Sequence, residues 1–123
     1  PPIETFFTSD EASAENQYYS TLLHEFIHAT GAKKRLDRET MRDYHRSVSV
    51  RAKEELIAEI GSAMLGQKLG IQTEPMADNA AYIQSWIKRL EDHPKAVFEA
   101  AAAASRGIRW LDAQQPAEEK EAA

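Results

Sequence analysis

The segment His24-Glu25-Phe26-Ile27-His28 decides how this 123-residue chain is interpreted. Two histidines four positions apart lie about one turn from each other on the same face of an α-helix, so both rings can reach a single ion. Glu25 projects from the adjacent face, where its carboxylate can take a proton from a water molecule that the ion activates. The spacing predicts a zinc site with His24 and His28 as ligands and Glu25 as the general base.

The surroundings of the motif favour a metal site over a chance triplet on a solvated helix. The motif lies in a predicted helix of about residues 11 to 30, which Gly31 ends. Leu23, Phe26 and Ile27 are apolar and are expected to lie behind the histidines. A half-buried setting of this kind suits an ion that activates water.

A catalytic zinc generally has three protein ligands, and the sequence offers the third on a second predicted helix, about residues 49 to 69. One class of zinc hydrolases has a third histidine where this chain has Lys34, whose ammonium group cannot bind a cation. We predict that Glu55 binds the metal and that Glu59 accepts the second ring N–H of a zinc histidine. The reverse assignment of these two glutamates stays open.

Several neighbouring residues are alternatives for these roles. Glu54, Asp43 and His45 are further candidate ligands. Tyr44 and His45 are also candidates to polarise a substrate carbonyl or to stabilise an oxyanion. An ordinary surface position is the competing interpretation for both residues.

The rest of the chain predicts a mainly α-helical fold with little or no β-sheet. Residues 1 to 7 suit an extended segment, and the charged residues 32 to 47 form a long connection with a short helical turn. Two C-terminal helices follow, one between Asp78 and Pro94 and one over about residues 94 to 111, in which Val97, Phe98 and Ile108 are expected to be buried. We predict one domain over residues 1–112 and a disordered tail over residues 113–123.

The composition limits the kinds of reactive and metal-binding site that the chain can form and indicates its cellular compartment. The absence of cysteine excludes disulfides, thiolate zinc sites and cysteine nucleophiles. No apolar stretch approaches the roughly 20 residues of a membrane span, and no signal sequence opens the chain, so we expect a cytoplasmic protein without membrane contact. The net charge of −5 argues against nucleic acid as the main ligand, although residues 33–53 are rich in lysine and arginine.

These motifs resemble one known family. The matching stretches are residues 17–31 with the histidine motif, Lys34-Arg35-Leu36-Asp37-Arg38, Glu54-Glu55-Leu56-Ile57-Ala58-Glu59-Ile60-Gly61 and Asn79-Ala80-Ala81-Tyr82-Ile83-Gln84-Ser85-Trp86-Ile87. They are similar to the C-terminal zincin-like metallopeptidase domain of ArdC-type antirestriction proteins and of TraC-type primases from conjugative plasmids. Arg51 stands where that family is expected to have a tyrosine.

The resemblance implies a zincin-like core in which His24, His28 and Glu55 bind one Zn²⁺ per chain and Glu25 is catalytic. It implies a bacterial metallopeptidase that acts on a peptide or protein substrate in antirestriction. It also implies an upstream single-stranded-DNA-binding domain in a longer protein. The alternative function is a zinc-stabilised module that protects by binding DNA or a protein without hydrolysis, and amidase activity on a small substrate is a third.

Overall fold

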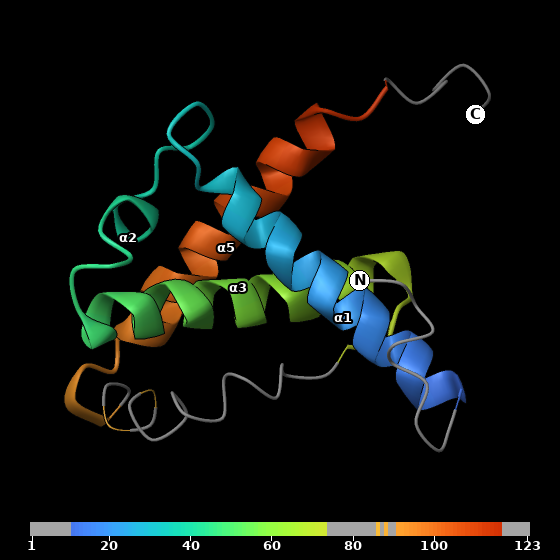
Figure 1. The fold of residues 1–123 in the computed structure, drawn as a ribbon, viewed down its shortest axis with the longest axis horizontal. Helices are drawn as coiled ribbons and strands as arrows, with labels where there is room; N and C mark the ends of the chain where they lie inside the picture. The colour runs from blue at the N-terminus through green and yellow to red at the C-terminus, as the bar shows by residue number, and fades with distance from the viewer. Residues whose placement is uncertain (1–10, 74–85, 87, 89–90, 117–123) are drawn as a thin grey trace.

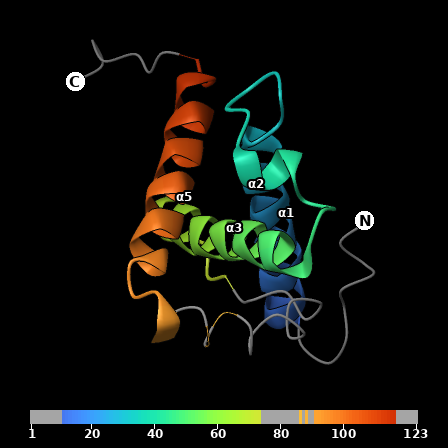
Figure 2. The same cartoon turned by 90° about the vertical axis from the view of Figure 1, so that its left-hand side faces the viewer.

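Helix α3 (Val48–Leu69) is the central element of the structure, a computed structural model that describes residues 11–73, 86, 88 and 91–116. Helices α1 (Glu11–Thr30) and α5 (Ala96–Ala113) both pack against α3, and the two views show α3 crossing between them (Figures 1 and 2). The short α2 (Glu39–Arg42) lies in the connection from α1 to α3 and also contacts α3. No strand occurs in the described residues, and the predicted mainly α-helical class is confirmed.

The ends of α3 follow from its terminal residues. The Ser47 side chain accepts a hydrogen bond of 3.1 Å from the N–H of Val50, which satisfies one free backbone donor of the first turn. At the other end Gly70 has φ 74, a left-handed conformation that glycine adopts without strain, and its N–H bonds back to the last turn. These bounds agree with the predicted helix of residues 49 to 69.

Helix α1 ends at Thr30, directly before Gly31, as predicted. The reason for a glycine here is close approach, because a Cβ atom at Gly31 would lie 2.7 Å from Cζ of Arg38 and 2.6 Å from Cγ of Met41. The N–H of Arg38 also donates to the carbonyl of Gly31 at 3.0 Å. The connection after α1 therefore folds back against the end of that helix.

The hydrophobic core joins the three long helices. Alanines on α5 let this helix approach α3 closely, since their side chains are small. The buried members are Leu23 and Ile27 of α1, Leu56, Ile57, Ala58 and Leu65 of α3, and Ala100, Ala103, Ala104 and Ile108 of α5.

Three core predictions were wrong. Phe26, Val97 and Phe98 are 43%, 39% and 74% exposed. Phe98 precedes the buried Ala100 by two positions, which turns its side chain about 200° around the helix, away from α3. Phe26 likewise lies outside the stripe of α1 that faces α3, which runs through Leu23 and Ile27.

The third predicted helix and the first predicted extended segment lie almost wholly outside the described residues. Trp86 is described, and its indole N–H donates to the carbonyl of Ala52 on α3 at 2.9 Å while its ring packs against the core. Helix α5 reaches Ala113, so it enters the segment predicted as a tail, whose last residues, 117–123, are not described. Within the part of the chain that the structure describes, no helix is long and apolar enough to cross a membrane.

Candidate metal centre

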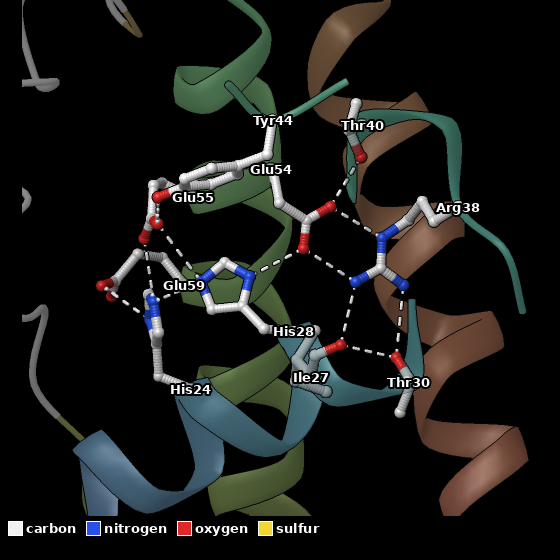
Figure 3. Close-up of polar contacts among 10 residues, drawn as sticks. All are labelled: His24, Ile27, His28, Thr30, Arg38, Thr40, Tyr44, Glu54, Glu55 and Glu59. Carbon is white, nitrogen blue, oxygen red and sulfur yellow. Dashed lines mark hydrogen bonds and ion pairs between the residues drawn. The ribbon is translucent and has the colours of Figure 1, made fainter. Parts of the chain in front are cut away.

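His24 and His28 both point from α1 toward α3, between the two helices (Figure 3). The His24 residue is 1% exposed and lies on the same buried stripe as Leu23 and Ile27, whereas His28 is only partly buried. The Nε2 atoms of the two imidazoles are 3.0 Å apart. The i, i+4 spacing thus brings the two rings together at the interface of the helices.

Glu55 on α3 faces these two nitrogens. Its Oε2 atom lies 2.9 Å from Nε2 of His24, and its Oε1 atom lies 3.3 Å from Nε2 of His28. His24, His28 and Glu55 each offer one ligand atom, and these three atoms all lie within 4.8 Å of one another. Two helices far apart in the sequence therefore converge on one point.

The opposite nitrogens of both rings also face carboxylates. Nδ1 of His24 lies 3.1 Å from Oε1 of Glu59, and Nδ1 of His28 lies 2.7 Å from Oε2 of Glu54 (Figure 3). In the neutral form of each ring, a carboxylate at Nδ1 favours the proton on that nitrogen and so leaves the lone pair on Nε2 for an ion. Both rings are thus arranged with their Nε2 atoms toward Glu55.

Glu54 is fully buried and is held by residues of the connection after α1. Arg38 donates from Nε to Oε1 and from Nη2 to Oε2, both at 2.8 Å. The hydroxyl of Thr40 donates to Oε1 at 2.6 Å. With His28 at Oε2, both oxygens of this carboxylate are saturated, so Glu54 is not placed as the alternative ligand that the sequence suggested.

Contacts within the cluster shift the pKa values of its two histidines and of Glu55. Burial lowers the pKa of His28, but the carboxylates of Glu54 and Glu55 outweigh burial and raise it to about 9. Burial also lowers the pKa of His24, and hydrogen bonds to Glu55 and Glu59 again leave it raised. For Glu55 burial raises the pKa, yet hydrogen bonds from His24, His28 and Tyr44 bring it below its usual range.

The pKa of Glu54 is likewise lowered. Burial acts against ionisation of this carboxyl, and the hydrogen bonds from Arg38, His28 and Thr40 together with the charge of Arg38 overcome it. Glu54 and Glu55 are therefore both ionised at neutral pH and surround the imidazoles with negative charge.

A cavity of about 340 Å³ opens beside this cluster. Glu25 and His45, both exposed, line it together with His28, Tyr44 and Glu55. The hydroxyl of Tyr44 donates to Oε1 of Glu55 at 2.6 Å. The predicted general base and both predicted carbonyl-polarising residues thus lie around the same opening.

The structure brings some of the metal-site residues suggested by the sequence together and leaves others apart. It brings His24, His28, Glu55 and Glu59 together, whereas Asp43 pairs with Arg46 at 3.3 Å on the surface. Sequence reasoning missed Arg38 and Thr40, because one arginine in a segment rich in lysine and arginine carries no distinguishing signal.

The donor set fits zinc. Two neutral imidazole nitrogens and one carboxylate oxygen match the ligands of a catalytic zinc, which has three protein ligands and one open position. The ring nitrogens that would bind the ion face Glu55, Nδ1 of His28 is hydrogen-bonded to Glu54, and Nδ1 of His24 lies 3.1 Å from Oε1 of Glu59. The three ligand atoms already lie within 4.8 Å of one another.

The fold and the site together define a helical domain with a His-Glu-x-x-His helix and a facing glutamate helix. A family model described as a zincin-like metallopeptidase matches residues 1–103, and the chain belongs to this family. The resemblance noted from the sequence is confirmed, and the domain is of the ArdC type.

Two curated relatives from Escherichia coli are named DNA primase TraC and are 46% and 48% identical to the chain over 93 and 94 residues. Uncharacterized protein y4eC of Sinorhizobium fredii is 41% identical over 98 residues. The matches cover 76%, 76% and 80% of this chain but only 6%, 8% and 31% of those proteins.

A solved structure also resembles this one. The metal-free crystal structure of the antirestriction protein ArdC from plasmid R388 has a TM-score of 0.70 and 43% sequence identity. The match covers 91% of this chain and 37% of that chain. The chain therefore corresponds to a fraction of the length of its relatives.

Proposed function

We propose that this domain is a zinc-dependent metallopeptidase that hydrolyses peptide bonds in an antirestriction protein of a bacterial mobile element. The observation that carries the proposal is the convergence of His24, His28 and Glu55 beside a cavity that Glu25 lines. The match to the antirestriction protein ArdC supports the biological setting.

His24 and His28 would hold the zinc through Nε2 and Glu55 through a carboxylate oxygen. Bound there, zinc supplies Lewis-acid chemistry that lowers the pKa of a water molecule and polarises a carbonyl group. The hydrogen bond of 2.7 Å between Nδ1 of His28 and Glu54 maintains the orientation of that ring, and the negative charge of Glu59, 3.1 Å from Nδ1 of His24, favours a proton on that nitrogen.

Glu25 would act as general base because it is exposed and lines the cavity. Among the described residues, no salt bridge holds its carboxylate away from the cavity. Its carboxylate accepts a proton from the attacking water and passes it to the leaving amine. Tyr44 and His45 border the same cavity, and we propose them as groups that stabilise the developing oxyanion of the substrate, for which Tyr44 would turn its hydroxyl from Glu55 to the substrate.

The proposed substrate is a peptide or a protein that can enter an open surface cavity. The whole protein would also carry an upstream domain that binds single-stranded DNA, in keeping with relatives much longer than this chain. Cytoplasmic action follows from the proposed role against host restriction.

The test compares the zinc-loaded protein with its Glu25→Gln variant. An unstructured protein such as β-casein is the probe, and mass spectrometry of new peptide termini is the readout. We expect cleavage by the zinc-loaded protein, none after chelation, and none by Glu25→Gln although this variant still holds one zinc ion per chain.

Cleavage that persists in Glu25→Gln, or a protein that takes up no zinc, would overturn the proposal. The same pair of proteins separates hydrolysis from binding in cells that restrict incoming DNA. Protection lost with Glu25→Gln supports the peptidase, whereas full protection supports a zinc-stabilised binding module instead.

A further inference from the structure

We propose that Arg38 and Thr40 are positioning residues for the metal centre, which act on the ligand His28 through the buried carboxylate of Glu54. The inference rests on the proposed zinc site and deepens it. It assigns a role to the connection between α1 and α3, a segment whose positive charge otherwise suggests contact with DNA.

Both oxygens of the buried Glu54 carboxylate are saturated with hydrogen bonds. This side chain is 0% exposed, and a buried carboxylate is stable only when it is paired and hydrogen-bonded. Arg38 binds both oxygens at 2.8 Å, and Thr40 adds a bond of 2.6 Å to Oε1. The carboxylate is thereby fixed in one orientation.

The fixed carboxylate of Glu54 in turn fixes the ring of the proposed ligand His28. Oε2 of Glu54 accepts from Nδ1 of His28 at 2.7 Å. A ring held at Nδ1 cannot rotate without breaking that bond, so its Nε2 atom stays aimed at His24 and Glu55. Arg38 thus reaches the metal centre through two contacts, although it touches no ligand itself (Figure 3).

Arg38 is itself anchored to the end of α1. Nη2 also donates to the carbonyl of Ile27 at 2.9 Å, and Nη1 donates to Oγ1 of Thr30 at 3.2 Å. These acceptors belong to the last turn of α1, whose carbonyls lack helical partners. One guanidinium therefore joins the end of the histidine helix to the glutamate of α3 (Figure 3).

Gly31 lies directly against the guanidinium of Arg38. A Cβ atom at this position would lie 2.7 Å from both Cζ and Nη2 of Arg38. The backbone conformation of Gly31 does not itself require glycine, because its φ is not positive. The glycine makes room for the guanidinium.

The test measures zinc affinity by competition with a chelator. Thr40→Val keeps the shape of the side chain but removes its hydroxyl, and Arg38→Lys keeps the charge but removes the two-point contact with Glu54. We expect each variant to weaken zinc binding by about 10-fold or more, the range found for residues that hold metal ligands. Thr40→Ser, which retains the hydroxyl, should bind zinc with wild-type affinity.

Gly31→Ala offers a second route to the same result, because it displaces Arg38 without altering any hydrogen-bonding group. Its matched control is Gly66→Ala, at a glycine of α3 that is equally crowded, with a Cβ position 2.4 Å from Cγ2 of Thr73. Only Gly31→Ala should weaken zinc binding. Arg42→Met is the charge control, since Arg42 lies in the same connection but pairs with Asp37 on the surface.

Thermal unfolding of each metal-free variant separates this role from general destabilisation. Zinc affinity that is reduced at a temperature where the variant is fully folded supports the proposal. Wild-type affinity in both Thr40→Val and Arg38→Lys, with a wild-type protein that does bind zinc, overturns it. A wild-type protein that binds no zinc overturns instead the proposed function on which the inference depends.

Discussion

The Nε2 atoms of His24 and His28 lie 3.0 Å apart, facing each other across one turn of α1. Two ring nitrogens at this distance repel if both present lone pairs and collide if both carry hydrogens. They are compatible with one shared proton or one shared cation. With Glu55 beside the two nitrogens, we expect a bound zinc ion to take the place of the protons on Nε2.

Loss of a ligand should abolish tight zinc binding. We expect the wild-type protein to bind one zinc ion per chain, and His24→Ala, His28→Ala and Glu55→Ala each to weaken binding by more than about 100-fold. Zinc at about 100 times its Kd should raise the free energy of unfolding of the wild-type protein by about 2.7 kcal/mol. Metal analysis and thermal unfolding with and without zinc measure both effects, and a ligand variant with wild-type affinity would contradict the assignment.

The stability of the metal-free protein should depend on pH through His28. Its pKa is raised from 6.5 to about 9 in the fold, so its contribution to stability is fully present below pH 6.5 and is lost as pH rises through about 9. The pKa of Glu55 is lowered from 4.5, so its contribution is present above pH 4.5 and is lost as pH falls.

Metal-free protein should therefore be most resistant to urea at about pH 5.5 and less resistant at about pH 9. Urea unfolding in excess chelator measures this difference. The fall on the alkaline side should shrink in His28→Gln, which has no proton to lose. Equal midpoints at both pH values in the wild-type protein would refute the prediction.

Zinc affinity should increase with pH over the same range. At neutral pH the metal-free His28 is protonated, because its pKa is about 9, and this proton must leave before Nε2 can bind zinc. For one proton released, affinity should rise by up to about 10-fold per pH unit and level off above about pH 9. Titration with a zinc buffer at several pH values tests this, and an affinity independent of pH would exclude proton displacement.

Removal of the Tyr44 hydroxyl should affect the metal centre more than the fold. That hydroxyl donates to Oε1 of Glu55 at 2.6 Å, and Tyr44→Phe leaves the carboxylate with one contact fewer. We expect zinc affinity to fall by about 10-fold and the free energy of unfolding to change by no more than about 1.5 kcal/mol. Tyr19→Phe, a half-buried tyrosine of α1, is the control that should bind zinc normally.

The distance between α1 and α3 should be sensitive to substitution of Gly61. A Cβ atom there would lie 2.7 Å from Cγ1 of Ile27, which is fully buried between the two histidines of α1. Gly61→Ala should destabilise the protein by about 1–3 kcal/mol and weaken zinc binding, since the ligands come from both helices.

Gly70→Ala is the comparison for this variant. Its added methyl meets nothing within 4 Å, and only the left-handed backbone, with φ 74, opposes it. We expect a cost of about 1 kcal/mol and unchanged zinc affinity. Chemical unfolding and chelator competition measure both variants, and equal zinc affinity in the two would mean that the helix separation does not set the site.

Much of this protein could be predicted from local sequence, because the signals involved have short range. The four-residue spacing of His24 and His28 places both rings on one helical face whatever surrounds them. Ser47 and Gly70 mark the ends of α3 by their own hydrogen bonding and backbone preference. The helical class follows from the same periodic patterns.

Only the tertiary structure decided how the glutamates divide their roles. Glu54, Glu55 and Glu59 lie on one helix, and their order in the sequence does not reveal which imidazole nitrogen each will face. That choice depends on how α3 is rotated against α1, which is set by close packing at Ile27 and Gly61. The pairing of Arg38 with Glu54 depends on how the connection folds back onto α1, and contacts between distant residues leave no local pattern in a single sequence.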